Sequence, residues 1–457
     1  MKRHPHPLWL WYHLRRFWPL LFIPAARLLY ARVTGEAPAG LGRDGVAALL
    51  LIGGAVWLWR TTHYAADARG AVLWEGIWRR ERRVFLSRVT AVGIVRTPLM
   101  GLCRARRVWL YAAGRRKGTG FSLYLDRESA QRFGVRRACP CRIRRFWPTL
   151  VLSLSGSNAV VGLLTAILPL RHAARLWGEW AAAELVTLAD RFILLNLPPA
   201  FKALVLCLLA GWAVAFVRNL LRYAGFSVET EGEELCLRGG VFTRRNIRFS
   251  RREVMAVLLR QTLPMGLLRL YSASAALAGR GRTESVRPVL VPAAGERALS
   301  RELYRLFPGR RTPGAFHHPP RAGQRRYLWA PFLWLTAGAI LPFGGSLWRP
   351  LAGFWLAAAG WWYAVRLWGC RAAGCVATED YLLLRYPRGL ALYTAVIPRG
   401  AVEAVELRQS PWQRQSGLCT VVVSTGGGRH RLWGLRRATV KAELFRDGEN
   451  ENNLISI

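Results

Sequence analysis

The strongest constraint on the fold is a polar unit that occurs three times along the chain. Without a gap, the copy that begins at Gly76 aligns with the copy that begins at Gly389, and Thr97-Pro98 then falls on Ser410-Pro411. The middle copy begins at Gly240, and a shift of one residue brings Arg260-Gln-Thr onto Arg408-Gln-Ser. Its match is looser, because Arg269 stands where the third copy has Gly417. A repeat of this length indicates an array of domains rather than a solenoid.

Each polar unit has the pattern of β-strands followed by a short helix. Residues 381–386 and 420–424 are rich in β-branched and aromatic residues and are bounded by turn residues, which predicts strands. Three segments near the ends of the units, 126–133, 296–307 and 436–445, are predicted to be helices. In the second of these, Leu299, Leu303 and Leu306 share one helical face.

A pair of apolar runs precedes each polar unit. The pairs are 17–30 with 45–59, 147–170 with 203–217, and 328–347 with 351–368. A helix that crosses a bilayer needs about 20 residues, and 52% of the whole chain is hydrophobic, with 21 Trp. The runs therefore predict about six transmembrane helices in three hairpins. Arg27 interrupts the first run, so an interfacial helix is the alternative there.

The charge distribution predicts how such hairpins would be oriented. The formal net charge is +41, and the polar segment 61–145 carries +15, from 20 basic and 5 acidic residues. Segments 223–327 and 369–457 are also positive, whereas the links within the first two pairs are neutral. Because positive loops stay in the cytoplasm, the three polar units are expected to face the cytoplasm, in a multi-pass protein of the cell membrane.

These observations predict a mixed fold, with membrane α-helices and soluble β domains in alternation. The expected units are a first hairpin 1–60, a domain 61–145, a second hairpin 146–222, a domain 223–310, a linker 311–327, a third hairpin 328–368, a domain 369–446 and a tail 447–457.

The third unit carries the most specific signature. From Arg408 to Leu418 it reads R-Q-S-P-x-Q-R-x-x-G-L, and a T-G-G turn follows at Thr425. This pattern resembles the bacterial pleckstrin-homology (PH) domain, and the whole chain resembles the YdbT-like membrane proteins, in which hairpins alternate with such domains. The resemblance implies three small, strongly bent antiparallel barrels, each closed by a C-terminal helix. It brings no catalytic residues, and it suggests a role in envelope stress or in resistance to antimicrobial peptides.

The sequence contains little that indicates catalysis or metal binding. It lacks HExxH, GxSxG and GxxxxGK[ST], and its eight Cys show no paired C-x-x-C spacing. His317 and His318 are adjacent, but they lie in a Pro-rich linker. We therefore expect a protein that is not an enzyme and that needs no cofactor or metal.

Two basic segments are the candidate binding sites. They are expected to be turns that face lipid headgroups, and they contain Arg79, Arg80, Arg82 and Arg83 in the first unit and Arg244, Arg245 and Arg248 in the second. Arginine can bind phosphate in a bidentate manner. The corresponding piece of the third unit, 392–395, is uncharged, and a solvated basic face without a ligand is the alternative.

The sequence thus predicts a non-enzymatic scaffold that binds protein partners or lipid at the membrane. The expected partners are the lipid bilayer, anionic lipid headgroups, and a smaller PH-domain membrane protein or a second copy of the chain, with no nucleic acid. The alternative is a transporter or channel subunit, suggested by Ser153, Ser155, Ser157 and Asn158 within one apolar run.

Overall fold

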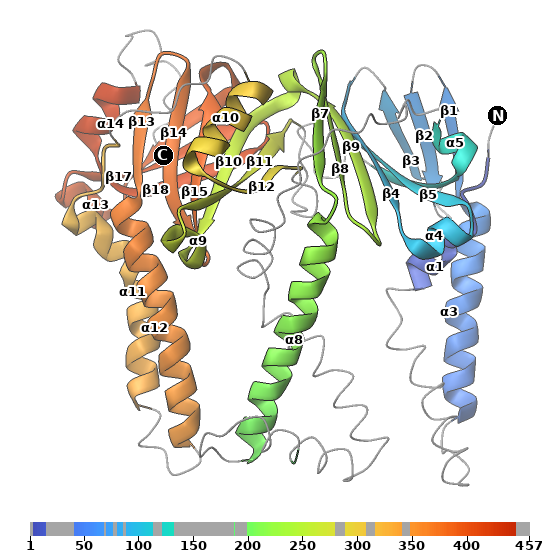
Figure 1. Cartoon of the computed structure of the whole chain (residues 1–457), viewed down its shortest axis with the longest axis horizontal. Coiled ribbons are helices and arrows are strands. Elements are labelled where there is room, and N and C mark those ends of the chain that lie inside the picture. Colours follow the sequence, from blue (N-terminus) through green and yellow to red (C-terminus); the bar gives the residue numbers. More distant parts are fainter. Residues whose placement is uncertain are drawn as a thin grey trace.

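Three β domains lie in a row in the computed structural model, and long helices extend from one side of the row (Figure 1). The structure describes residues 3–14, 41–67, 70–75, 80–85, 88–112, 121–131, 187, 199–278, 288–307, 316–340 and 348–444. Several predicted features lie outside these ranges: the apolar runs 17–30 and 147–170 with their polar residues 153–158, part of the linker 311–327, and the tail 447–457.

Each β domain consists of three strands, a corner, three more strands and a short helix. The first contains β1 (His63–Asp67), β2 (Gly70–Glu75), β3 (Arg80–Phe85), β4 (Val89–Arg96), α4 (Pro98–Leu102), β5 (Ala105–Ala112), β6 (Phe121–Asp126) and α5 (Arg127–Gln131). The second contains β7 (Ser227–Glu231), β8 (Glu234–Gly239), β9 (Arg244–Ser250), β10 (Val254–Thr262), α9 (Leu263–Leu267), β11 (Leu270–Leu277), β12 (Val289–Gly295) and α10 (Glu296–Leu306). The third contains β13 (Gly374–Ala377), β14 (Tyr381–Arg388), β15 (Ala391–Pro398), β16 (Val402–Arg408), α13 (Pro411–Gln415), β17 (Leu418–Thr425), β18 (Gly428–Arg436) and α14 (Arg437–Leu444).

The predicted strands and closing helices are confirmed. Segment 381–386 lies within β14, and segment 420–424 lies within β17. The predicted helices correspond to α5, α10 and α14. In α10, Leu299 and Leu306 are buried, as their shared face requires.

The domains are joined by shared sheets rather than by loops alone. Strand β4 pairs with β9, which gives a six-stranded sheet in the order β6-β5-β4-β9-β8-β7. Strand β10 pairs with β15 in the same way, in the order β12-β11-β10-β15-β14-β13. Each sheet therefore crosses a domain boundary, and the second domain contributes three strands to each.

A strand at a junction is buried on both faces because it serves two cores. In β10, Val257 packs in the core of the second domain, whereas Ala256 and Leu258 pack in the core of the third. Successive side chains of a strand point to opposite faces, so a strand between two cores must be apolar at consecutive positions. This explains why residues 254–259 (VMAVLL) are apolar without alternation.

Within the described residues, four long helices adjoin the β domains, together with the short α1 (Leu8–Leu14). They are α3 (Leu41–Thr61), α8 (Pro199–Tyr223), α11 (Arg321–Ile340) and α12 (Trp348–Ala372). Helices α11 and α12 pack as a hairpin, in which the Trp334 and Trp355 rings stack at 4.6 Å. The Trp355 indole also donates a hydrogen bond to the Trp334 carbonyl oxygen at 2.8 Å.

The prediction of six transmembrane helices is wrong for the part of the chain that the structure describes, where no helix is long and apolar enough to cross a membrane. Charged residues near the helix ends are the physical reason. The uncharged stretches are 45–59 in α3, 203–217 in α8, 327–340 in α11 and 350–365 in α12. Each is shorter than the minimum of about 17 residues.

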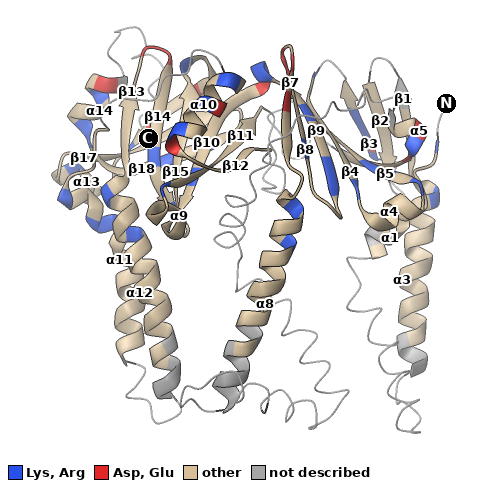
Figure 2. Ribbon diagram, viewed as in Figure 1, with Lys and Arg blue, Asp and Glu red and all other residues tan. Residues whose placement is uncertain are grey.

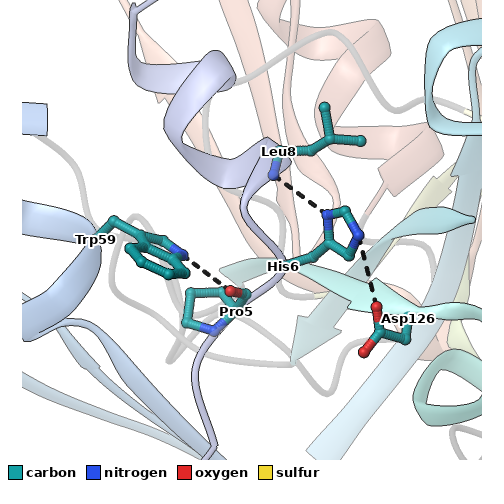
Figure 3. A network of polar contacts seen from close by, with 5 residues as sticks. All are labelled: Pro5, His6, Leu8, Trp59 and Asp126. Atoms are coloured by element: carbon teal, nitrogen blue, oxygen red, sulfur yellow. Dashed lines mark hydrogen bonds and ion pairs between the residues drawn. The ribbon is translucent and has the colours of Figure 1, made fainter. Parts of the chain in front are cut away.

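The N-terminal segment is fastened to the first β domain (Figure 3). The Trp59 indole donates to the Pro5 carbonyl oxygen at 2.9 Å, and the Leu8 amide donates to His6 Nδ1 at 3.2 Å. On its other side, His6 Nε2 lies 3.6 Å from a carboxylate oxygen of Asp126. These contacts join α1 and α3 to the end of β6.

The same kind of segment covers the outer edge of the first strand in two domains. Arg3 and Tyr64 of β1 exchange backbone hydrogen bonds of 2.9 and 2.8 Å. His317 and Cys375 of β13 do likewise, at 2.9 and 3.1 Å. Pairing of this kind protects an edge that could otherwise bind another chain.

Candidate functional site

The predicted basic turns are strands in the structure. Arg80, Arg82 and Arg83 lie on β3, and Arg244, Arg245 and Arg248 lie on β9, the equivalent strand of the second domain. Arg79 lies outside the described residues. In the second domain the turn, residues 240–243, precedes β9, so Arg244, Arg245 and Arg248 lie on a strand rather than in the expected turn.

Three of these arginines contact carboxylates of their own domain. Arg82 lies 3.6 Å from Glu75, and Arg83 lies 2.8 Å from Glu81. Arg248 pairs with Glu234 and lies 3.7 Å from Glu231. Internal ion pairs of this kind reduce the positive charge that these side chains offer to a ligand.

Arg245 has different surroundings. Val95 of β4 pairs with Arg245 of β9 on one side and with Arg107 of β5 on the other. Both arginines therefore lie on the same face of the shared sheet. Burial lowers the pKa of Arg245, and the nearby Arg222 lowers it further. Arg245 Nε and Trp109 Nε1 are buried and have no hydrogen-bond acceptor among the described residues. Buried donors normally have an acceptor, so this basic cluster is suited to an anion.

Large apolar side chains are exposed at a second, repeated feature. A one-turn helix follows the fourth strand of each domain: α4, α9 and α13. Leu102, Leu267 and Trp412 of these turns are 84%, 81% and 79% exposed, and Leu99 and Leu268 are also exposed. Exposed large apolar side chains at the same turn of all three domains indicate a contact surface.

A second set of turns adds apolar residues beside these helices. Val241 and Phe242 precede β9, and Leu390 precedes β15; all three are exposed. Antiparallel pairing places Arg244 opposite Arg96, next to α4, and Ala391 opposite Thr262, next to α9. The two sets of turns therefore lie side by side at each junction. We name them the helix-side rim, which comprises Leu99, Leu102, Val241, Phe242, Leu267, Leu268, Leu390 and Trp412.

The rim lies where the long helices meet the β domains (Figure 1). The Val241 amide donates to the Leu221 carbonyl oxygen near the end of α8 at 3.1 Å. A Cβ atom on Gly266 of α9 would lie 2.8 Å from the Trp368 ring of α12. This close approach fixes α9, and hence Leu267, against the helix.

Charge is distributed unevenly between the two ends of the β domains (Figure 2). Acidic residues gather in the β7–β8 and β13–β14 turns, on the side away from the helices, where Glu231 and Glu233 belong to the first turn and Glu379 and Asp380 to the second. Basic residues lie close to the rim, including Arg104, Arg269 and Arg414, which follow or end the one-turn helices. The rim is thus apolar with basic flanks.

Sequence reasoning missed the rim, although it used the same residues to align the repeats. Turn tips are normally polar, rich in Gly, Pro, Asn and Asp. The P-L-M-G-L turn at Pro98 in the first copy, and Val241-Phe242 and the L-P-M-G-L turn at Leu263 in the second, depart from that rule, and so does Trp412 within the more polar turn of the third copy. Apolar residues at these turn tips are the sequence feature that indicates the rim.

A groove lies between the second and third β domains. It has a volume of about 1100 Å³, and its walls include Tyr271, Arg297, Arg301, Leu383, Arg385 and Val396. Burial lowers the pKa of Arg385, whose guanidinium lies over the Phe316 ring at 4.4 Å and donates to the Thr394 hydroxyl at 3.1 Å. Both interactions hold this arginine within the structure.

The described residues contain no cluster of side chains that could hold a metal ion. His317 Nε2 lies 2.7 Å from a Glu443 carboxylate oxygen, and His318 Nδ1 lies 2.7 Å from the Ala373 carbonyl oxygen. The two adjacent histidines therefore join the start of α11 to the third β domain.

Comparison with protein families gives one match, repeated along the chain. The model described as "Bacterial PH domain" matches residues 20–138, 159–306 and 330–447. Comparison with curated proteins gives no match. Together the three regions cover most of the sequence, and each ends at or just beyond the last helix of one β domain. The chain therefore belongs to the bacterial PH domain family.

Proposed function

We propose that this protein is a non-enzymatic scaffold whose helix-side rim binds the surface of an anionic lipid bilayer at the cytoplasmic face of the cell membrane. PH domains are interaction modules, and three of them in one chain give three copies of the same contact. The observation that carries the proposal is the exposure of large apolar side chains at equivalent turns of all three domains.

The chemistry of the rim suits the interface of a bilayer. Leucine and tryptophan side chains gain about 25 cal/mol for each Å² of apolar surface that leaves water, and tryptophan is enriched at the level of the headgroups. Each basic residue near an anionic surface adds about 1 kcal/mol. A single domain would bind weakly, but three linked domains bind with a high effective concentration.

The basic cluster adds a candidate site for the phosphate of a headgroup. Arg107, Arg222 and Arg245 come from β5, the end of α8 and β9. Arg222 is two residues from Ala224, whose carbonyl oxygen accepts a hydrogen bond from Gly240, next to the rim residue Val241. A phosphate that reaches Arg245 would meet donors that have no acceptor among the described residues.

Flotation of the full chain with vesicles tests the proposal. The expected result is binding to vesicles with about one third anionic lipid, and binding at least about tenfold weaker to purely zwitterionic vesicles. The variant Leu102→Ser/Leu267→Ser/Trp412→Ser should bind at least about tenfold more weakly than the parent chain, because it removes one anchor from each domain. Arg245→Gln should weaken only the binding to anionic vesicles.

Two matched variants serve as controls. Tyr304→Ser alters an exposed aromatic residue on α10, outside the rim, and Arg431→Gln removes an exposed charge on β18. Both should bind like the parent chain. Equal binding by the parent chain and the triple rim variant would overturn the proposal, and so would capture of a protein partner without any affinity for vesicles.

The three PH repeats support kinship with the YdbT-like proteins, and from that resemblance we infer a role in the cell envelope, in stress or in resistance to antimicrobial peptides. Sensitivity of a deletion strain to such peptides tests it. The transporter alternative rests on residues 153–158, which lie outside the described ranges.

A further inference from the structure

Two strand edges differ from all their equivalents. Within the described residues, β3 of the first domain and β16 of the third each pair on one side only. The strands equivalent to β3 are β9 and β15, and the strands equivalent to β16 are β4 and β10. All four pair with a neighbour on both sides. The row of domains thus ends in the same two kinds of strand that meet at each internal junction.

The two internal junctions have the same register. A bulge follows the valine that starts β4, β10 and β16, which makes Val89, Val254 and Val402 equivalent. Three residues further on, Val92 lies opposite Arg248, and Val257 lies opposite Val396.

Those two partners are themselves equivalent. Arg248 is two residues before Ser250, and Val396 is two residues before Pro398; Ser250 and Pro398 each pair with the first residue of the preceding strand. In the first domain this position is Phe85, which pairs with Gly70. If β3 and β16 pair in the same register as the two internal junctions, the residue three after Val402 therefore lies opposite the residue two before Phe85.

Exposure of side chains also separates the end strands from the internal ones. In β3 only Val84 is buried, and Phe85 is 48% exposed. In β16 no residue is buried, whereas six of the nine residues of β10 are. Side chains on β3 and β16 are therefore exposed, and three further strands paired to either edge would cover them.

We propose that two copies of this chain join end to end, with β16 of one copy paired antiparallel to β3 of the next. The shared register places Val405 opposite Arg83, Glu406 opposite Arg82 and Leu407 opposite Glu81. The result is a third six-stranded sheet of the kind that already joins the domains within one chain. This inference does not depend on lipid binding.

Charge complementarity favours a second copy as the occupant. Strand β3 has three arginines and one glutamate, whereas β16 has two glutamates and one arginine. Within one copy, Glu406 contacts Arg408 at 2.6 Å, and Arg82 contacts Glu75 at 3.6 Å. Pairing would place Glu406 opposite Arg82 on a face that also carries Glu75, Arg80 and Arg408, so that two acids lie among three bases.

Three other outer edges, those of β1, β7 and β13, are less suited to pairing. The Arg3 and His317 bridges occupy the edges of β1 and β13. Strand β7 (SVETE) carries two glutamates, and Glu233 follows in the turn. Since the proposed contact joins two different surfaces, it is heterologous and builds a chain or a closed ring rather than a symmetric dimer.

Sedimentation velocity of the full chain, with charge-exchange variants, tests the proposal. The parent chain should associate as its concentration rises. Glu406→Arg and Arg82→Glu should each weaken self-association about tenfold, since each places like charges opposite one another. An equimolar mixture of the two variants should regain association, because each mixed junction then has opposite charges. The double variant Glu406→Arg/Arg82→Glu should associate on its own.

Cysteine crosslinking tests the register. Oxidation of a chain with Glu406→Cys and Arg82→Cys should give a disulfide between copies, identified by mass spectrometry of the joined peptides. Glu406→Cys with Arg80→Cys, two residues out of register, should give much less. A parent chain that stays monomeric would overturn the proposal, as would association that neither single variant weakens and that mixing does not restore.

Discussion

Tyr327 of α11 and Trp433 of β18 are joined by two hydrogen bonds through one hydroxyl group. The Tyr327 hydroxyl donates to the Trp433 carbonyl oxygen at 3.0 Å and accepts from the Trp433 amide at 2.8 Å. The two rings also contact each other, with centroids 5.3 Å apart. A single side chain thus fastens the α11–α12 hairpin to the third β domain.

Tyr327→Phe is expected to lower the free energy of unfolding by about 1–3 kcal/mol. The substitution keeps the ring but leaves a half-buried carbonyl and a half-buried amide without their partner, and that desolvation penalty sets the magnitude. Chemical denaturation of the full chain measures it. Tyr363→Phe on α12 is the matched control, since the Tyr363 hydroxyl has no hydrogen bond within the described residues. Equal effects of the two variants would contradict the assignment.

The second residue after each one-turn helix has a left-handed backbone. Arg104 has a φ of 55°, Arg269 a φ of 50° and Gly417 a φ of 64°. A residue with a Cβ atom pays about 1–2 kcal/mol in this region. Arg269→Gly is therefore expected to raise the free energy of unfolding by up to about 1 kcal/mol, after the entropy that glycine loses is subtracted.

The reverse change completes this test. Gly417→Ala should lower the free energy of unfolding by about 1 kcal/mol, although the structure leaves open space for the added methyl group. Thermal unfolding of both variants measures the pair of shifts. Shifts in the same direction would contradict a shared left-handed position.

Alkaline pH should destabilise the third β domain. Burial raises the pKa of Cys375 to about 12, with a smaller contribution from Glu443, and burial raises that of Cys419 to about 11. An unfolded thiol ionises near pH 9, so above that pH the unfolded chain binds fewer protons than the folded one. The free energy of unfolding therefore falls as pH rises from about 9 to 11, by about 1.4 kcal/mol per pH unit for each thiol.

Other groups titrate in the same range, so a difference measurement is needed. Denaturation at pH 7.5 and pH 10, for the parent chain and for Cys375→Ala/Cys419→Ala, isolates the thiols. The variant should show a smaller loss of stability over this interval. An identical loss in both proteins would show that the two thiols do not stay protonated in the folded state.

The repeat and the strands could be predicted from the sequence because they depend on local patterns. Residues 420–424 carry β-branched side chains, and the polar piece after Arg408 ends its strand with a one-turn helix capped by Ser410 and Gln413. Even the mismatch between Arg269 and Gly417 disappears in the structure, since both adopt the same left-handed backbone.

The sharing of sheets could not be predicted in the same way. Whether the edge of β4 stays free or pairs with β9 depends on a surface about 150 residues away in the sequence, and apolar runs alone do not distinguish a strand buried by one core from a strand buried by two. The arginines of β9 were placed in a turn for a related reason. Arg244, Arg245 and Arg248 lack the alternation of a half-buried strand, because one face of β9 carries the Arg248–Glu234 ion pair and the other carries Arg245 in the basic cluster.

The most direct test of the central claim uses Cys103, an exposed residue next to Leu102 on the rim. With all other cysteines replaced by alanine, an environment-sensitive fluorophore on Cys103 should shift to shorter wavelength and brighten when anionic vesicles are added. The same label on Glu379→Cys, in a chain that also carries Cys103→Ala, reports on the opposite end of the third domain and should not change. A response at Glu379→Cys equal to or larger than that at Cys103 would contradict binding through the helix-side rim.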